Sequence, residues 1–150
     1  MSIVKAHRFP VSVQWQEGRL TQARAPGKPP LDVATPPEFK GGVPGVWSPE
    51  DLLVAATAAC YAVTLLAVAE RKCVPLFDLH VEGAGHVELV EGRFRFVAIN
   101  LIANIDVEPE LAEAARRAAR DAKDVCLVNL ALDTPVHLEV HVKARGLVVA

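Results

Sequence analysis

The stretch Ser48-Pro49-Glu50-Asp51-Leu52-Leu53-Val54-Ala55-Ala56-Thr57-Ala58-Ala59-Cys60 opens a long apolar segment of the chain and decides the fold. Ser48 can cap a helix, proline is favoured at the first helical position, and the two acidic residues complement the positive end of the helix dipole. We therefore predict a helix from about Pro49 to about Lys72. Because its interior is apolar on nearly every face, we expect protein to cover it all round and the helix to be the central element of the fold.

The same segment raises the question of a membrane span. From Leu52 to Ala69 there are eighteen residues without a charge, which is close to the lower limit for crossing a bilayer. Seven of them are alanine, which contributes little to insertion, and two are threonine. We therefore expect a helix buried in protein, and we predict no membrane partner.

The residues before Ser48 predict short strands and an extended arm over residues 1–47. Val11 to Trp15 alternates apolar and polar residues, and Glu17-Gly18 is typical of a turn. Prolines and glycines then recur between Pro26 and Gly45, and this composition excludes a long helix there.

The residues after the helix, which we place over 48–73, predict a β-hairpin over residues 76–106. Two alternating stretches, Phe77–Glu82 and Phe94–Leu101, predict its strands, and Glu91-Gly92 predicts the turn.

Helical spacing of apolar residues then predicts helices over 109–132, and alternation predicts a final strand over 135–145 with one face in water. The wet face carries His137, Glu139 and His141, which could bind a metal, although a solvated strand face explains them more simply. The order of elements predicts an α+β fold in a single domain spanning residues 1–150, with β-sheets flanking the long buried helix.

Composition limits the possible partners and the compartment. The net charge is −2, with 16 basic and 18 acidic residues spread along 150 positions, so the chain has no electrostatic footprint for nucleic acid. The start of the sequence, Met1 to Lys5, lacks the apolar segment of a signal peptide, which favours a cytoplasmic protein. There a disulfide is more often transient and catalytic than structural. Since no zinc-type spacing occurs among the cysteines and histidines, we predict no metal and no cofactor.

The three cysteines are the candidates for chemistry. Taken alone, Cys60 is more often a small buried apolar residue than a nucleophile, and the same two interpretations apply to Cys126 and Cys73. Cys73 follows Cys60 by thirteen residues, about 20 Å along a helix, so the two cannot share a site within one subunit. We expect Cys73 to be a bystander.

Two motifs resemble those of the OsmC/Ohr family, the osmotically inducible protein C and organic hydroperoxide resistance proteins. Ser48–Cys60 resembles the family's helix with its Pro-Glu start and Ala-Ala-Cys end, and Ala122–Asn129 resembles its second cysteine segment. The family usually has proline after that second cysteine, whereas this chain has Leu127. The resemblance implies an intertwined homodimer in which two central helices pack together and the active sites lie at the subunit interface.

The resemblance also implies the chemistry of an organic hydroperoxide reductase. Cys60 would attack the peroxide and become a sulfenic acid, and Cys126 would condense with it to a disulfide. An external dithiol would reopen that disulfide by exchange. An apolar channel involving Phe39, Trp47 and Tyr61 would favour alkyl or lipid hydroperoxides.

Activation of Cys60 would use an arginine held by the glutamate that Glu50 matches in the family motif. We assign that arginine to Arg19, which follows Gly18 in the N-terminal region, with Arg24 as the second choice. Two alternatives stay open. One is an OsmC-fold protein of drifted function that binds lipids or electrophiles without efficient turnover, and the other is a structural dimer with inert thiols.

Overall fold

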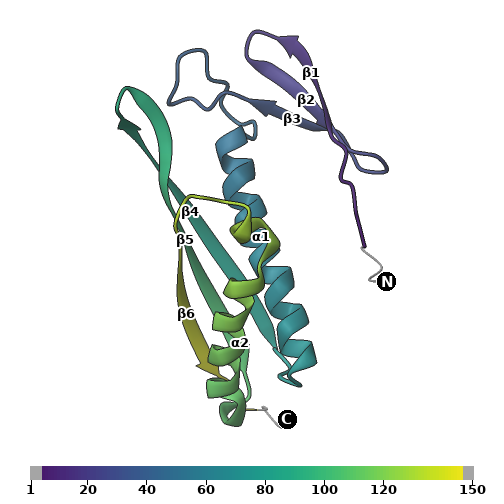
Figure 1. The fold of residues 1–150 in the computed structure, drawn as a ribbon, viewed down its shortest axis with the longest axis vertical. Coiled ribbons are helices and arrows are strands. Elements are labelled where there is room, and N and C mark those ends of the chain that lie inside the picture. Colours follow the sequence, from purple (N-terminus) through teal and green to yellow (C-terminus); the bar gives the residue numbers. More distant parts are fainter. Residues whose placement is uncertain (1–4, 147–150) are drawn as a thin grey trace. The chain divides into compact units, whose positions relative to one another are not determined.

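The computed structural model describes residues 5–146, which form two compact units, one ending at Leu52 and the other beginning at Leu53 (Figure 1). Residues 1–4, on which the prediction about a signal peptide largely depends, lie outside the described residues. The first unit contains an antiparallel sheet of order β1-β2-β3, formed by strands Ser12–Glu17, Leu20–Arg24 and Leu31–Ala34. The predicted N-terminal strand and its turn are confirmed, and the turn contains Gly18 with φ +49°.

The segment between β3 and the first helix is an irregular loop, as its prolines and glycines predict. No helix occurs among residues 5–48. The loop returns to the sheet where the Ala34 N–H donates to the Trp47 carbonyl at 2.9 Å, and Val33 and Trp47 form an isolated bridge. The chain is therefore held against β3 immediately before the helix begins.

Helix α1, Pro49–Arg71, confirms the predicted central helix and its start. Ser48 Oγ accepts from the Asp51 N–H at 3.0 Å, and Asp51 Oδ2 accepts from the Ser48 N–H at 3.0 Å. This reciprocal pair satisfies two backbone donors at the start of the helix. At the other end the Val74 N–H donates to the Ala69 carbonyl at 2.9 Å and the Cys73 N–H to the Glu70 carbonyl at 3.1 Å, which is the Schellman pattern.

The described chain covers only one face of α1. Buried residues lie on that face: Thr57, Tyr61, Leu65, Val68 and Ala69. On the opposite face Val63 is 62% exposed and Leu66 is 49% exposed. The expectation of cover on every side is therefore not met within residues 5–146. By length and composition α1 could cross a membrane, a test that the core helices of soluble proteins also pass, and 28% of its most apolar stretch is buried.

The second unit is built on a sheet of order β4-β5-β6, with strands Asp78–Val90, Arg93–Val107 and Val136–Ala144. Strands β4 and β5 form the predicted antiparallel hairpin, longer than expected, and its turn has positive φ at Glu91 and Gly92. Strand β6 pairs parallel to β5 and exposes alternate residues, as predicted.

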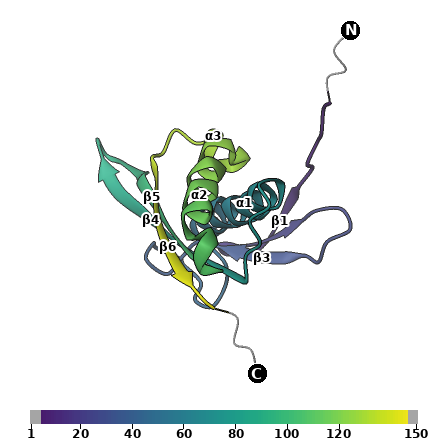
Figure 2. The same cartoon turned by 90° about the horizontal axis from the view of Figure 1, so that it is seen from below.

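A helical segment connects β5 to β6. It consists of a short 3₁₀ helix η1, Pro109–Leu111, then α2, Ala112–Val125, and the single turn α3, Leu127–Leu130. Helices α1 and α2 lie on the same side of the sheet (Figure 2). Their apolar faces and the inward residues of the strands form the core of an α+β fold.

Candidate functional site

The structure brings Cys60 and Cys126 together from segments far apart in the sequence. Cys60 lies in the middle of α1, half-buried and packed against the core, while Cys126 is buried at the bend between α2 and α3. The two thiols lie close enough for each to influence the pKa of the other. The pairing predicted for these two residues is therefore possible within one chain.

The surroundings of Cys60 favour its thiolate. Burial raises the pKa of the Cys60 thiol, but a set of donors outweighs burial and holds that pKa below its ordinary value. In order of effect, these donors are the Val128 N–H, the Cys126 thiol, the Thr64 hydroxyl and the Leu127 N–H. A thiol with a lowered pKa is the more nucleophilic one at neutral pH, because the thiolate is the reactive form.

Cys126 is shifted in the opposite direction. Burial raises its pKa, the N–H groups of Asn129 and Val128 oppose that effect, and the neighbouring Cys60 adds to the increase. The pKa values of the two thiols are therefore shifted in opposite directions, and Cys60 is the more readily ionised of the pair.

Two side-chain hydrogen bonds fix α2 and the bend at Cys126. The Tyr61 hydroxyl donates to the Ala119 carbonyl of α2 at 3.0 Å, and Asn129 Nδ2 donates to the Lys123 carbonyl at 3.2 Å. Burial raises the pKa of Tyr61, so its hydroxyl keeps the donated proton. The expectation that Tyr61 lines an open channel is wrong, because its side chain is only 1% exposed and its hydroxyl is bonded inside the core. Phe39 and Trp47, the other residues expected along that channel, lie in the first unit.

Arg19, Glu50 and Arg24 all lie in the unit that ends at Leu52. The Arg19 side chain crosses Gly41, where an added Cβ would come within 3.1 Å of Arg19 Cγ and where φ is +82°. Glu50 Oε2 is buried and has no hydrogen-bond partner among the described residues. No ion pair joins Arg19 to Glu50 within residues 5–146, whereas Arg24 is exposed and donates to Gln22.

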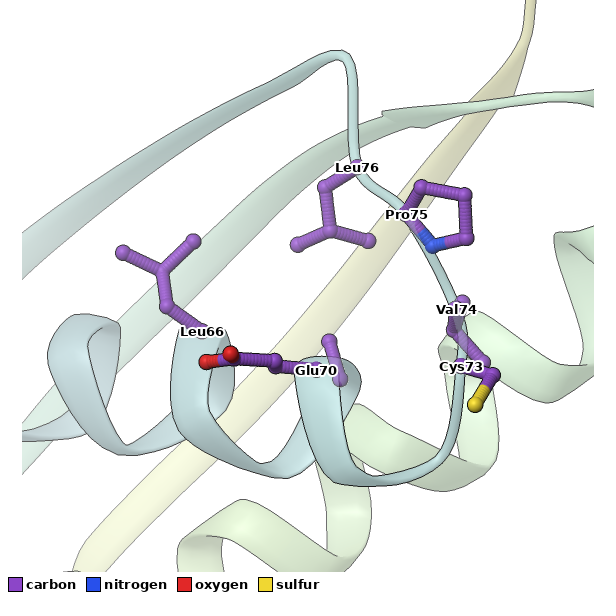
Figure 3. A pocket seen from close by; sticks show the side chains of 7 residues that line it. Leu66, Glu70, Cys73, Val74, Pro75 and Leu76 are labelled. Atoms are coloured by element: carbon purple, nitrogen blue, oxygen red, sulfur yellow. The ribbon is translucent and has the colours of Figure 1, made fainter.

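Cys73 lies apart from the thiol pair. It is exposed just beyond the end of α1, where it lines an open pocket of about 400 Å³ (Figure 3). The rest of the lining is mostly apolar: Leu66, Ala69, Glu70, Val74, Pro75 and Leu76. Neither Cys60 nor Cys126 belongs to this pocket, which agrees with the expectation that Cys73 does not share their site.

One histidine of β6, His141, is engaged with neighbouring side chains. His141 contacts Glu139 and Asn104 on the exposed face of the sheet. In the part of the chain that the structure describes, no group of three or more His, Cys, Asp or Glu side chains is placed to hold a metal ion.

Sequence reasoning missed Thr64 and the backbone donors of Leu127 and Val128. Thr64 follows Cys60 by four residues, a spacing that places both side chains on one helix face and could have been noticed. The two N–H groups carry no sequence signal, since every residue except proline has one.

The fold and the two thiols define a small α+β protein in which a cysteine of the central helix, Cys60, lies near a second cysteine at the end of α2, Cys126. The OsmC-like protein family matches residues 42–141, so the chain belongs to this family. It is 24% identical to the uncharacterized protein YmaD of Bacillus subtilis (strain 168) over 144 residues, 93% of this chain and 95% of that protein.

Solved structures share the fold. An OsmC-like protein of unknown function from Vibrio cholerae superposes with a TM-score of 0.81 at 15% identity, covering 91% of this chain and all of that one. An organic hydroperoxide resistance protein from Legionella pneumophila superposes with a TM-score of 0.76 at 24% identity, covering 93% of this chain and 100% of that one. At these identities the similarity to these structures establishes the fold.

Proposed function

We propose that this protein is a cysteine-based peroxidase that reduces organic hydroperoxides to alcohols. The observation that carries the proposal is the proximity of Cys60, whose thiol pKa is lowered, to Cys126, whose thiol pKa is raised. The similar Legionella pneumophila structure, which is that of an organic hydroperoxide resistance protein, supports the substrate class.

The first step oxidises Cys60. Its thiolate attacks the terminal oxygen of the hydroperoxide, the O–O bond breaks, and the alkoxide takes up a proton and leaves as the alcohol. A new S–O bond makes Cys60 a sulfenic acid, and the peroxide has received two electrons from the sulfur.

The second step closes a disulfide. Cys126 loses its proton and attacks the sulfenic sulfur of Cys60, an S–S bond forms, and the oxygen leaves as water. An external dithiol in the cytoplasm then returns both cysteines to thiols by two exchange reactions. No cofactor takes part in either step.

Glu50 and Arg19 would serve a Cys60 in a second copy of the chain. Glu50 and Cys60 are ten residues apart on α1, about 15 Å, so the carboxylate does not reach the thiol of its own chain. A buried carboxylate oxygen without a partner is costly, and a guanidinium is the cation that pairs best with it. Arg19, held in the space that Gly41 leaves, would meet Glu50 and the peroxide oxygens in the assembled dimer.

Exposed apolar surfaces support a homodimer. The uncovered face of α1 carries Val63 and Leu66, flanked by exposed alanines, at the i, i+3 spacing of a packing stripe. Strand β1 and the residues before it expose a second row of alternate large apolar side chains: Phe9, Val11, Val13 and Trp15. Apolar surfaces of this kind are typical of interfaces between subunits. Size-exclusion chromatography with light scattering tests the assembly, and a stable, active monomer would contradict it.

Thiol counting after peroxide treatment separates the possible functions. The chain has three cysteines, and reduced protein treated with one equivalent of cumene hydroperoxide should lose two thiols and release cumyl alcohol. Loss of one thiol would indicate oxidation without resolution, as in a protein of drifted function. Loss of none would contradict the peroxidase. The Cys73→Ser variant serves as the control, because it should also lose two thiols.

A further inference from the structure

Tyr61 is a buried polar side chain that the two proposed steps do not use. It follows Cys60 on α1, and its side chain is only 1% exposed. Its hydroxyl donates to the Ala119 carbonyl of α2 at 3.0 Å, across 58 positions of the sequence. A hydroxyl buried without a partner is costly, so this bond favours the one arrangement of the two helices that satisfies it.

The surface of α2 that receives this bond consists of small side chains. The buried residues of α2 are Ala115, Ala118, Ala119 and Ala122. Alanine has no side chain long enough to interlock with a facing helix, so apolar packing alone specifies poorly how far α2 lies along α1. A directional hydrogen bond specifies it well, because the donor and the acceptor meet at only one position of one helix along the other.

The same face of α2 leads to Cys126. Ala119 precedes Cys126 by seven residues, which is two helical turns or about 10 Å, and both residues are buried. The Asn129 side chain donates to the Lys123 carbonyl at 3.2 Å and fixes the bend at Cys126 to the last turn of α2. A shift of α2 along α1 would therefore displace the Cys126 thiol from Cys60.

The far ends of the two helices have a weaker contact. Lys72, just past α1, forms an ion pair with Asp121 of α2, and both side chains are exposed. Exposed ion pairs contribute little to stability because solvent screens them and two long side chains lose freedom. The buried bond of Tyr61 is therefore the contact that fixes the register of the helices near the thiols.

We propose that Tyr61 is a positioning residue, which fixes the register of α2 on α1 so that Cys126 meets Cys60 for disulfide closure. Its hydroxyl does not take part in the reaction. It raises the equilibrium constant for closure, since sulfurs that are already held together lose less conformational freedom when the S–S bond forms. The inference rests on the proposed function, in which this disulfide resolves the Cys60 sulfenic acid.

The test measures disulfide closure without peroxide. In the Cys73→Ser background the protein equilibrates with reduced and oxidised dithiothreitol. Two protein thiols pass two electrons and two protons to the oxidised reagent, and their S–S bond forms as that of the reagent breaks. Tyr61→Phe keeps the ring and loses the hydroxyl, while the Ala119 carbonyl keeps the N–H of its own helix. The equilibrium constant should fall roughly fivefold, the effect of one lost hydrogen bond.

Thr57→Val is the matched control. The Thr57 hydroxyl is also buried and donates to the Leu53 carbonyl at 2.8 Å, so its loss removes one hydrogen bond that lies within α1. Thermal unfolding should show a comparable loss of stability in Thr57→Val and Tyr61→Phe, whereas the disulfide constant of Thr57→Val should stay at the parent value. Asn129→Ala frees the bend from α2 and should also lower the constant, so it decides the matter if Tyr61→Phe unfolds.

Three results would overturn the proposal. They are an unchanged constant in the folded variant, equal decreases in Tyr61→Phe and Thr57→Val, and a parent protein that closes no disulfide between Cys60 and Cys126. The fate of the proposed function is separate, because the exchange involves no peroxide. Constants that change as expected in a protein that consumes no hydroperoxide would contradict the peroxidase and leave the positioning by Tyr61 intact.

Discussion

Helix α1 places two cysteines in opposite environments, Cys60 in its middle and Cys73 just past its end. Cys60 is half-buried beside a second thiol, and hydrogen-bond donors hold the pKa of its thiol below the ordinary value despite burial. Cys73 is exposed, and its own N–H is used to close the end of the helix. The comparison teaches that the surroundings of a cysteine, and not its presence on the helix, set the ease with which its thiol ionises.

The largest expected difference between the two cysteines is in activity, and it is tested by replacing each of them with serine in a separate variant. Cys60→Ser should abolish consumption of cumene hydroperoxide, because a serine hydroxyl is not ionised at neutral pH and cannot form a sulfenic acid. Cys73→Ser should consume peroxide at the wild-type rate. Steady-state peroxide assays with a dithiol reductant measure both. An active Cys60→Ser protein or an inactive Cys73→Ser protein would reverse the assignment.

A second variant separates oxidation from resolution. Cys126→Ser should react with one equivalent of peroxide and then stop, because no thiol remains beside Cys60 to condense with the sulfenic acid. Trapping with dimedone and mass spectrometry should identify the sulfenic acid on Cys60, and excess peroxide should convert it to sulfinic acid. If Cys126→Ser instead formed a disulfide with Cys73, the resolving role would belong to Cys73.

The third prediction concerns the arginine, whose effect should be smaller than loss of either cysteine. Arg19→Ala should slow peroxide reduction by roughly tenfold or more, since a guanidinium stabilises charge on the peroxide oxygens. Arg19→Lys should rescue poorly because an ammonium cannot make the planar, two-pronged contact. Glu50→Gln should show a weaker defect of the same kind.

Arg24→Ala is the matched control for the arginine, since Arg24 is exposed on β2 and bonded to Gln22. Wild-type rates in Arg19→Ala together with a defect in Arg24→Ala would move the role to position 24. Wild-type rates in both variants would leave activation to the donors around Cys60 alone.

Most elements of the fold could be predicted because their signals are local. Ser48 and Pro49 mark the start of α1, and the alternation on both sides of Glu91-Gly92 marks the hairpin. Each of these elements can therefore be predicted from residues that are neighbours in the sequence. The cover of α1 could not be predicted in the same way. Its sequence is apolar all round, but which face the chain itself covers depends on how α2 and the β4-β5-β6 sheet pack.

In the candidate site, too, contacts between segments that are far apart in the sequence could not be predicted. Cys60 and Cys126 could be named from motifs, but nothing in the sequence says that their thiols meet or that Tyr61 ties α1 to α2. Tyr61 was expected to line a channel, whereas helical geometry turns it by about 100° from Cys60, toward the core. Glu50 and Arg19 could be named as well, and their pairing stays a prediction.

The last and smallest prediction tests the other end of the comparison, the backbone at Cys73. This residue has φ +55° at the position after α1 where helices ordinarily place glycine, because a Cβ is disfavoured there by roughly 1–2 kcal/mol. Cys73→Gly should therefore raise the free energy of unfolding, by about 0.5–1 kcal/mol after the greater freedom of glycine in the unfolded chain is subtracted. Cys73→Ala is the control, since it removes the same exposed sulfur but keeps the Cβ, and it should stay within about 0.5 kcal/mol of wild type. Urea unfolding followed by circular dichroism measures the three proteins. If the Cys73→Gly protein were no more stable than the Cys73→Ala protein, the left-handed backbone at position 73 would carry no strain. Cys60 and Cys73 would then differ only in the surroundings of their thiols.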